Sequence, residues 1–311
     1  MATAYFSHKD CLNHVTPPGH PEQVARLEAI QSKLDGPGYQ DLIRHSAPIC
    51  EDADVLLCHP QAYLDRIRGA IPTKGAVSLD ADTHVSPGSL LAAQRGVGAN
   101  IAAIDTVLDG QAANAFVGCR PPGHHAETNT AMGFCLFGNV AIGAKHALDR
   151  RGLDRVAIID FDVHHGNGTQ DLLWEESRVL FCSSHQMPLY PGSGAAHDTG
   201  AHGNVLNVPL DPDTGSDVMR RVYEREIFPE IDRFKPELIL VSAGFDAHAA
   251  DPLASLNWTT DDFAWLTHKI CDLADVHCAG RVVSTLEGGY DLKALAESVA
   301  AHVDVLRERG E

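Results

Sequence analysis

Short apolar runs alternate with helical patterns along the whole chain, and this alternation is the feature that most constrains the fold. Five runs have apolar residues at consecutive positions, so both faces of each strand would be buried; they span 113–119, 155–162, 179–184, 237–246 and 281–289. Such strands, separated by helices, are typical of a parallel sheet covered on both sides. The sequence therefore predicts an α/β fold. Its 311 residues contain no repeat or long linker, which favours a single domain over residues 1–311.

Apolar residues at helical spacing predict three helices between these strands. The segment 21–34 has Pro21 near its first position, where the missing N–H is tolerated. The segment 86–110 has Ser86 as a candidate N-cap and Gly110 as a candidate stop. A third amphipathic helix is predicted over 259–276.

Composition argues against several classes of function. The net charge is −18, from 24 Lys and Arg against 42 Asp and Glu, which disfavours binding to nucleic acid or to anionic membranes. The charge is compatible with a cationic substrate, although it is more often a matter of solubility. We find no signal-peptide pattern, no run of about 18 apolar residues and, among the eight cysteines, no CxxC pair. These features predict a soluble cytoplasmic protein with reduced thiols.

Four of the five predicted strands end in loops rich in reactive groups. These loops are RPPGHHAE (120–127), DVHHGNG (162–168), GFDAHAADPL (244–253) and EGGYD (287–291). Ligands of parallel α/β sheets bind at the carboxyl ends of the strands. We therefore expect the four loops to meet at one edge of the sheet and to form one site.

Asp162 and His164 flank one residue, so in an extended segment their side chains would point to the same side. With Asp246, at the end of another predicted strand, they would form a three-ligand metal site with an open position. Oxygen and nitrogen ligands without cysteine fit Zn²⁺, with Fe²⁺ or Co²⁺ as alternatives. Taken singly, each aspartate could instead be a loop cap.

The adjacent His124 and His125 could form a base and acid pair, with Asp160 and Asn167 as partners that hold them at different basicities. The residues alone leave open a second metal site or a surface pair. Tyr290 follows a Gly-Gly turn, and its hydroxyl could donate to a developing oxyanion or could simply pack.

Two aromatic residues in glycine-flanked loops, Phe134 and Tyr190, could wall a narrow apolar slot for an alkyl chain. Ordinary core packing is the alternative for both.

Together these motifs resemble the zinc-dependent histone deacetylase and acetylpolyamine amidohydrolase family, and most of all its class II branch and the bacterial histone deacetylase-like amidohydrolases. The similarity runs in order through TPPGHPEQVARL (16–27), LDADTHVSPGS (79–89), RPPGHHAE…GFC, DFDVHHGNGTQ, VSAGFDAHAADPL and LEGGYDL. It implies an arginase-like α/β domain with an eight-stranded parallel sheet and helices on both faces. It also implies hydrolysis of N-acetyl-lysine or a similar acylated amine to the free amine and acetate.

The resemblance also implies roles for individual residues. Asp162, His164 and Asp246 would bind one catalytic Zn²⁺, and Tyr290 would bind the substrate carbonyl and the oxyanion. His124 would pair with Asp160 and His125 with Asn167; one histidine would take a proton from the attacking water, and the pair would protonate the leaving amine.

Further implied sites are a structural K⁺ site and a substrate tunnel. The K⁺ site, largely of backbone carbonyls, would comprise Asp160, Asp162, His164, Ser183 and Ser184. The tunnel would be lined by Phe134, Tyr190, Gly133 and Leu253, with Asp82 at its rim to hold substrate backbone amides.

Four positions refine this prediction. Tyr290 stands where some class II enzymes carry His, which favours efficient deacetylation. Leu253 stands where polyamine-preferring relatives can carry an acid, which favours acyl-lysine. Gly166 and His248 stand where arginase-type enzymes have further bridging carboxylates, which favours one catalytic metal.

The alternatives are an acetylpolyamine amidohydrolase, a non-catalytic acyl-lysine binding protein on the same fold, and a hydrolase of an unrelated amide or ester. Because relatives of this kind often self-associate, a homo-oligomer is also expected.

Overall fold

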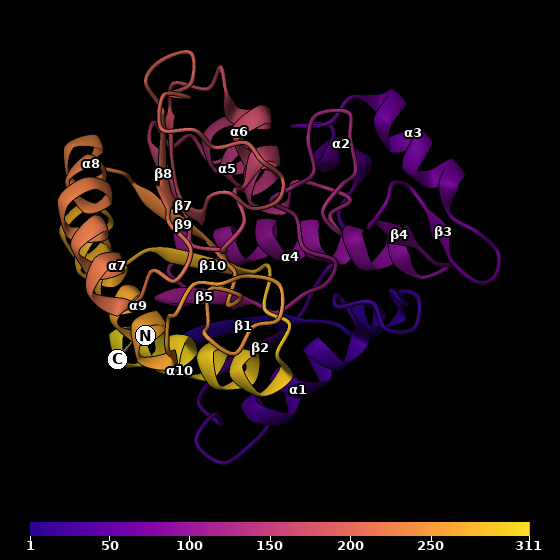
Figure 1. Ribbon diagram of the computed structural model, residues 1–311, viewed down its shortest axis with the longest axis horizontal. Coiled ribbons are helices and arrows are strands. Elements are labelled where there is room, and N and C mark those ends of the chain that lie inside the picture. Colours follow the sequence, from indigo (N-terminus) through magenta and orange to yellow (C-terminus); the bar gives the residue numbers. More distant parts are fainter. Residues whose placement is uncertain (311) are drawn as a thin grey trace.

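The computed structural model describes residues 1–310 and contains one eight-stranded parallel sheet (Figure 1). The strand order is β2-β1-β5-β10-β9-β6-β7-β8, and every neighbouring pair in this sheet is parallel. A separate antiparallel pair joins β3 to β4. The strands are β1 Thr3–Ser7, β2 Ile43–Ser46, β3 Val77–Ser78, β4 His84–Val85, β5 Asn114–Val117, β6 Val156–Asp160, β7 Val179–Gln186, β8 Val205–Leu210, β9 Leu238–Ala243 and β10 Val282–Leu286.

The five strands predicted from apolar runs are the five adjacent central strands, β5, β10, β9, β6 and β7. All their residues are buried, as expected for strands covered on both faces. The sequence patterns missed the outer strands β2, β1 and β8. Strand β2 alternates between half-buried and exposed residues, and β8 contains Pro209, which an edge strand tolerates.

Helices cover both faces of the sheet, as predicted (Figure 1). Helices α1, α9 and α10 pack together on one side, whereas α4 packs against α5 on the other. The helices are α1 Val24–Leu34, α2 Asp52–Val55, α3 Gln61–Ala70, α4 Ser89–Leu108, α5 Asn139–Asp149, α6 Asn167–Leu173, α7 Ser216–Val222, α8 Phe228–Phe234, α9 Thr260–Cys278 and α10 Leu292–Gly310, with a 3₁₀ turn at Lys9–Asn13 and a π turn at Tyr223–Ile227.

Two predicted helix starts differ from the structure. Helix α1 begins at Val24 rather than at Pro21, because the main chain of Glu22 is bonded to side chains of the preceding loop. Helix α4 begins after Gly88 without a side-chain cap, and the Ser86 hydroxyl instead accepts a bond from the Val15 N–H. The predicted stop at Gly110 is confirmed, since this glycine has a φ of 69°.

Seven of the eight cysteines are buried, and all eight are free thiols. Among residues 1–310, none of the helices combines the length and the apolar character that a bilayer crossing requires.

Candidate active site

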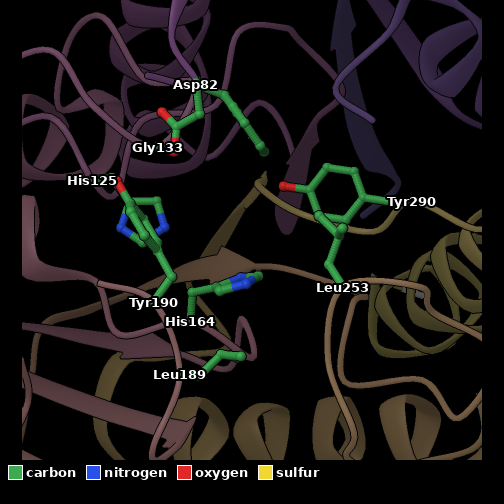
Figure 2. Close-up of a pocket in the computed structure, with 9 residues that line it drawn as sticks. Asp82, His125, Gly133, His164, Leu189, Tyr190, Leu253 and Tyr290 are labelled. Atoms are coloured by element: carbon green, nitrogen blue, oxygen red, sulfur yellow. The ribbon is translucent and has the colours of Figure 1, made fainter. Parts of the chain in front are cut away.

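The four reactive loops follow β5, β10, β9 and β6, which are adjacent in the sheet. Their side chains meet at the carboxyl edge around a cavity of about 230 Å³ (Figure 2). The lining residues are Asp82, His125, Gly133, Phe134, His164, Leu189, Tyr190, Leu253 and Tyr290. All of them except Leu189 were expected from the sequence; Leu189 lies beside Tyr190 in the PLYPG segment.

Asp162, His164 and Asp246 form one cluster, of which His164 also lines this cavity. One ligand atom from each residue falls within 4.8 Å of the others, and all three residues are buried. His164 Nδ1 lies 3.1 Å from an Asp162 oxygen and 3.2 Å from an Asp246 oxygen. The backbone fixes both carboxylates, because Asp162 accepts from the Gly288 N–H at 2.8 Å and Asp246 accepts from the Val163 N–H at 2.9 Å.

This cluster fits a divalent cation in charge and in shape. Burial lowers the pKa of His164, but its contacts with Asp162 and Asp246 outweigh burial and raise the pKa to about 10. Two buried carboxylates against one imidazole leave an excess of negative charge, which a bound cation compensates. Glycine backbones line it closely: a Cβ at Gly288 would lie 2.6 Å from an Asp162 oxygen and would overlap Asp246. Two oxygens and one nitrogen match the ligand chemistry of Zn²⁺.

The tandem histidines each have one polar partner. His124 Nδ1 lies 3.0 Å from an Asp160 oxygen, and His125 Nδ1 lies 2.7 Å from Asn167 Oδ1. The Asn167 amide nitrogen donates to Glu127 at 2.8 Å, which makes Oδ1 the atom that faces His125. His125 Nδ1 therefore donates, and Nε2 is left as the nitrogen that can accept a proton.

The pKa values of the two imidazoles shift in opposite directions. Burial lowers the pKa of His124, but the Asp162 and Asp160 carboxylates outweigh it and raise the pKa well above its usual value. The pKa of His125 lies well below its usual value, because of burial first and then of the charges of His124 and His164. His125 lines the cavity, whereas His124 does not.

Tyr290 lies across the cavity from His125, and its hydroxyl points into the cavity (Figure 2). Its ring packs edge-on against Phe134, with the ring centroids 5.9 Å apart. On the opposite wall, Tyr190 packs edge-on against His125 at 5.2 Å. Phe134 and Tyr190 therefore both contribute to the cavity wall, and Leu253 lies below Tyr290.

A fully buried cluster of charges supports the Tyr290 loop, and the sequence analysis missed it. Arg26 donates to the carbonyls of Gly289 and Glu287, each at 2.6 Å, and its guanidinium lies 4.8 Å from the centre of the Tyr290 ring. Glu22 pairs with Arg26 and with Arg120, and all three side chains are fully buried. A Glu and an Arg four residues apart at the start of a helix are usually a surface pair, so their spacing did not indicate this role.

Glu287 is a second buried acid that the sequence analysis quoted without assigning a role. One of its oxygens accepts from the main-chain N–H groups of Gly123 at 2.6 Å and His124 at 3.2 Å. Burial raises its pKa to about 7. Glu287 therefore joins the loop after β10 to the histidine loop after β5.

The rim carboxylate Asp82 is tied to the cavity wall by Thr83. The Thr83 hydroxyl donates to Asp82 at 2.9 Å and accepts from the Phe134 N–H at 3.1 Å. His20 bonds the Asp82 carbonyl at 2.9 Å and packs on the Phe134 ring. These contacts fix Asp82 beside the mouth of the cavity.

The residues expected to hold K⁺ include two of the candidate metal ligands, Asp162 and His164. Asp160 is paired with Ser183 in the register of β6 and β7, and Asp160, Asp162, His164, Ser183 and Ser184 are all buried. The Ser183 hydroxyl bonds His185 at 3.0 Å, and the Ser184 hydroxyl bonds Tyr223 at 2.6 Å.

The positions of an arginase-type second metal offer no extra carboxylate. Gly166 lies against the Asp160 carboxylate, and His248 Nδ1 accepts from the Ala250 N–H at 3.0 Å. Within residues 1–310, the one group of three or more potential ligands is Asp162, His164 and Asp246.

Comparisons with known proteins agree along the whole chain. The histone deacetylase domain family matches residues 20–306. A histone deacetylase-like amidohydrolase of Pseudomonas aeruginosa is 41% identical over 93% of this chain and 81% of its own. A probable deacetylase of Archaeoglobus fulgidus is 38% identical over 94% of this chain and 82% of its own. The crystal structure of the HDA15 HD domain superposes with a TM-score of 0.94 at 31% identity, covering 99% of this chain and 89% of that chain.

Proposed function

The chain belongs to the histone deacetylase family, and we propose that it is a zinc-dependent deacetylase acting on N-acetyl-lysine or a similar acylated amine. Family membership supports deacetylase activity, and hence a hydrolase. Zinc-dependent deacetylation is supported by one observation: a three-ligand cluster, a histidine pair and Tyr290 lie together at one small cavity. We also propose that residues 1–311 act as one deacetylase domain.

Asp162, His164 and Asp246 would hold Zn²⁺. When bound there, the ion would polarise the acyl carbonyl and bring the pKa of a water to roughly 7. We assign K⁺, as a structural ion, to the buried set Asp160, Asp162, His164, Ser183 and Ser184, which shares Asp162 and His164 with the Zn²⁺ ligands.

The proton transfers fall to the histidine pair in this proposal. His125 lines the cavity and has Nε2 available, so it accepts the proton of the attacking water. The C–N bond then breaks, the acyl carbon keeps the water oxygen, and the pair returns a proton to the departing amine. The Tyr290 hydroxyl donates a hydrogen bond to the oxygen on which negative charge develops. The products are acetate and the free amine.

The cavity walls favour an acyl-lysine side chain over a polyamine. At about 230 Å³ the cavity is smaller than most small-molecule sites, which suits a single acyl-amine chain. Its walls include Phe134, Leu189 and Leu253, and Asp82 is the one carboxylate among the lining residues. A second ammonium of a polyamine would lose hydration against these apolar walls, and Asp82 is the one lining acid that could pair with it. We assign Asp82, beside the mouth of the cavity, to accept from substrate backbone amides.

The test is turnover of a fluorogenic acetyl-lysine peptide beside acetylputrescine, with the protein chelated and then reloaded with zinc. We expect zinc to restore cleavage of the peptide in preference to acetylputrescine. Preferential cleavage of acetylputrescine would keep the chemistry and overturn the substrate. Bound zinc without turnover of either would favour a binding protein or an unrelated amide or ester.

The role of Tyr290 is tested by Tyr290→Phe, which removes one hydroxyl. We expect kcat to fall about 10²–10³-fold, as for loss of an oxyanion donor, with zinc still bound. The matched control is Tyr39→Phe, because the Tyr39 hydroxyl bonds Asp304 on α10, away from the cavity. A near-normal rate for Tyr290→Phe would remove Tyr290 from the proposed chemistry.

A further inference from the structure

The main chain that carries Tyr290 has little stiffness of its own. Tyr290 follows Gly288 and Gly289, and Gly289 has a φ of 117°, which residues with a side chain rarely adopt. Helix α10 begins only at Leu292. The position of the Tyr290 ring therefore depends on groups outside its own segment.

Arg26 holds the carbonyl groups on the amino-terminal side of Tyr290, at Glu287 and Gly289. These bonds fix the turn before the tyrosine. They leave the N–H of Tyr290 itself to another partner.

That partner is Asp251, in the loop after β9. One oxygen of its carboxylate accepts from the Tyr290 N–H at 2.7 Å, and the other accepts from the Leu253 N–H at 3.0 Å. The Asp251 N–H is itself bonded to the His248 carbonyl at 2.8 Å, and only 8% of the residue is exposed. One carboxylate thus joins the loop of Asp246 and Leu253 to the loop of Tyr290.

We propose that Asp251 is a positioning residue, which holds the main chain of Tyr290 so that the hydroxyl meets the reacting carbonyl. This inference rests on the deacetylase function proposed above. Asp251 does not line the cavity, so it acts through Tyr290 rather than on substrate. A carboxyl group suits the task, because its two oxygens can accept from two main-chain N–H groups at once.

The variants Asp251→Asn and Asp251→Ala separate this role from a general loss of structure. Asn keeps one acceptor oxygen, so Asp251→Asn should lower kcat by about 10-fold. Ala keeps none, so Asp251→Ala should lower kcat by about 100-fold, the scale expected for a misplaced reacting group. KM should change less than kcat, because the proposed effect is on the hydroxyl that meets the developing oxyanion. Zinc content should stay at the wild-type level.

Combining Asp251→Ala with Tyr290→Phe gives the decisive comparison. The phenylalanine keeps the main-chain N–H but has no hydroxyl to position. In that background Asp251→Ala should cost less than about twofold in kcat, since the two groups act as a unit. If Asp251→Ala lowered kcat by about 100-fold in this background as well, its effect would arise through Leu253 or general destabilisation. That result would overturn the proposal.

Hydrogen exchange tests the same contact without turnover. Asp251→Ala should speed exchange at the Tyr290 amide, measured in a peptide spanning 287–293. The matched control is Glu237→Gln, since Glu237 also accepts two main-chain N–H groups, from Asp154 and Arg155, at the opposite end of the sheet. Unchanged exchange at Tyr290 would refute the positioning role, whereas absence of wild-type turnover would refute only the deacetylase function.

Discussion

Glu22→Gln is the substitution for which the structure gives the clearest energetic expectation. The Glu22 carboxylate pairs with both nitrogens of the Arg120 fork, with Arg26 at 3.1 Å and with His14 at 3.4 Å. The Glu22, Arg26 and Arg120 side chains are 0% exposed and that of His14 is 2% exposed. Glutamine keeps the shape and one acceptor oxygen, but it leaves two buried guanidinium groups without an anion.

Removing one partner of a buried ion pair typically costs about 3–5 kcal/mol. Here the cations keep other acceptors: Arg26 donates to two main-chain carbonyls, and Arg120 donates to those of Cys11 at 3.3 Å and His14 at 3.2 Å. We therefore expect the free energy of unfolding to fall by about 3 kcal/mol. A typical protein has a total of about 5–15 kcal/mol, so this is a large share.

The assay is urea unfolding, in which the midpoint should fall while the slope m stays unchanged. The control is Glu230→Gln, because Glu230 pairs with Arg233 on the same helix but Arg233 is 71% exposed. That exposed pair should change the free energy of unfolding by no more than about 0.5 kcal/mol. A loss below about 1 kcal/mol for Glu22→Gln would show that the two guanidinium groups do not depend on this anion.

The pH dependence of the free energy of unfolding gives a second test of Glu22. Burial raises the pKa of Glu22, but Arg120 and His14 outweigh burial and hold it well below the usual 4.5. A carboxyl with a lowered folded pKa stabilises the protein above its unfolded pKa, and this contribution is lost as the pH falls below about 4.5. The Gln variant should lack that part of the acid sensitivity.

Two further predictions follow from the buried site and core. Gly288→Ala places a Cβ against Asp162 and Asp246, so zinc content measured by atomic absorption should fall sharply, and full occupancy would contradict the tight fit. Burial lowers the pKa of His302 from 6.5 to about 3, so the unfolded state binds its proton first as the pH falls. Between about pH 7.5 and about pH 5 the wild type should lose about 2 kcal/mol more stability than His302→Gln; equal losses in urea titrations would count against a neutral, buried His302.

The predictable part of the fold was its centre. Strands β5, β10, β9, β6 and β7 are buried on both faces, so their runs of apolar residues stand out without any knowledge of the tertiary structure. The outer strand β2 alternates half-buried and exposed residues over only four positions, and a pattern of this length is common in loops. The number eight came from the resemblance and not from the patterns.

Within the site, the residues found from sequence were those that break an apolar pattern. Asp162, His164 and Asp246 follow central strands, where a charged side chain needs a partner. Leu189 was missed because an apolar residue in a loop looks like ordinary packing. Asp251 was missed because an aspartate before a proline looks like a turn residue.

Glu22 with Arg26 and Glu230 with Arg233 show where sequence reasoning stops. Each pair places an acid one turn before an arginine on a helix or at its start, and only the first lies in a segment, 16–27, that the family resemblance covers. One is fully buried under the Tyr290 loop and the other is exposed. The difference lies in what α1 packs against, since Arg26 reaches residues 287 and 289, more than 260 positions away. Reactive groups can therefore be read from local pattern, whereas the groups that hold them in place are defined by contacts that only the folded chain makes.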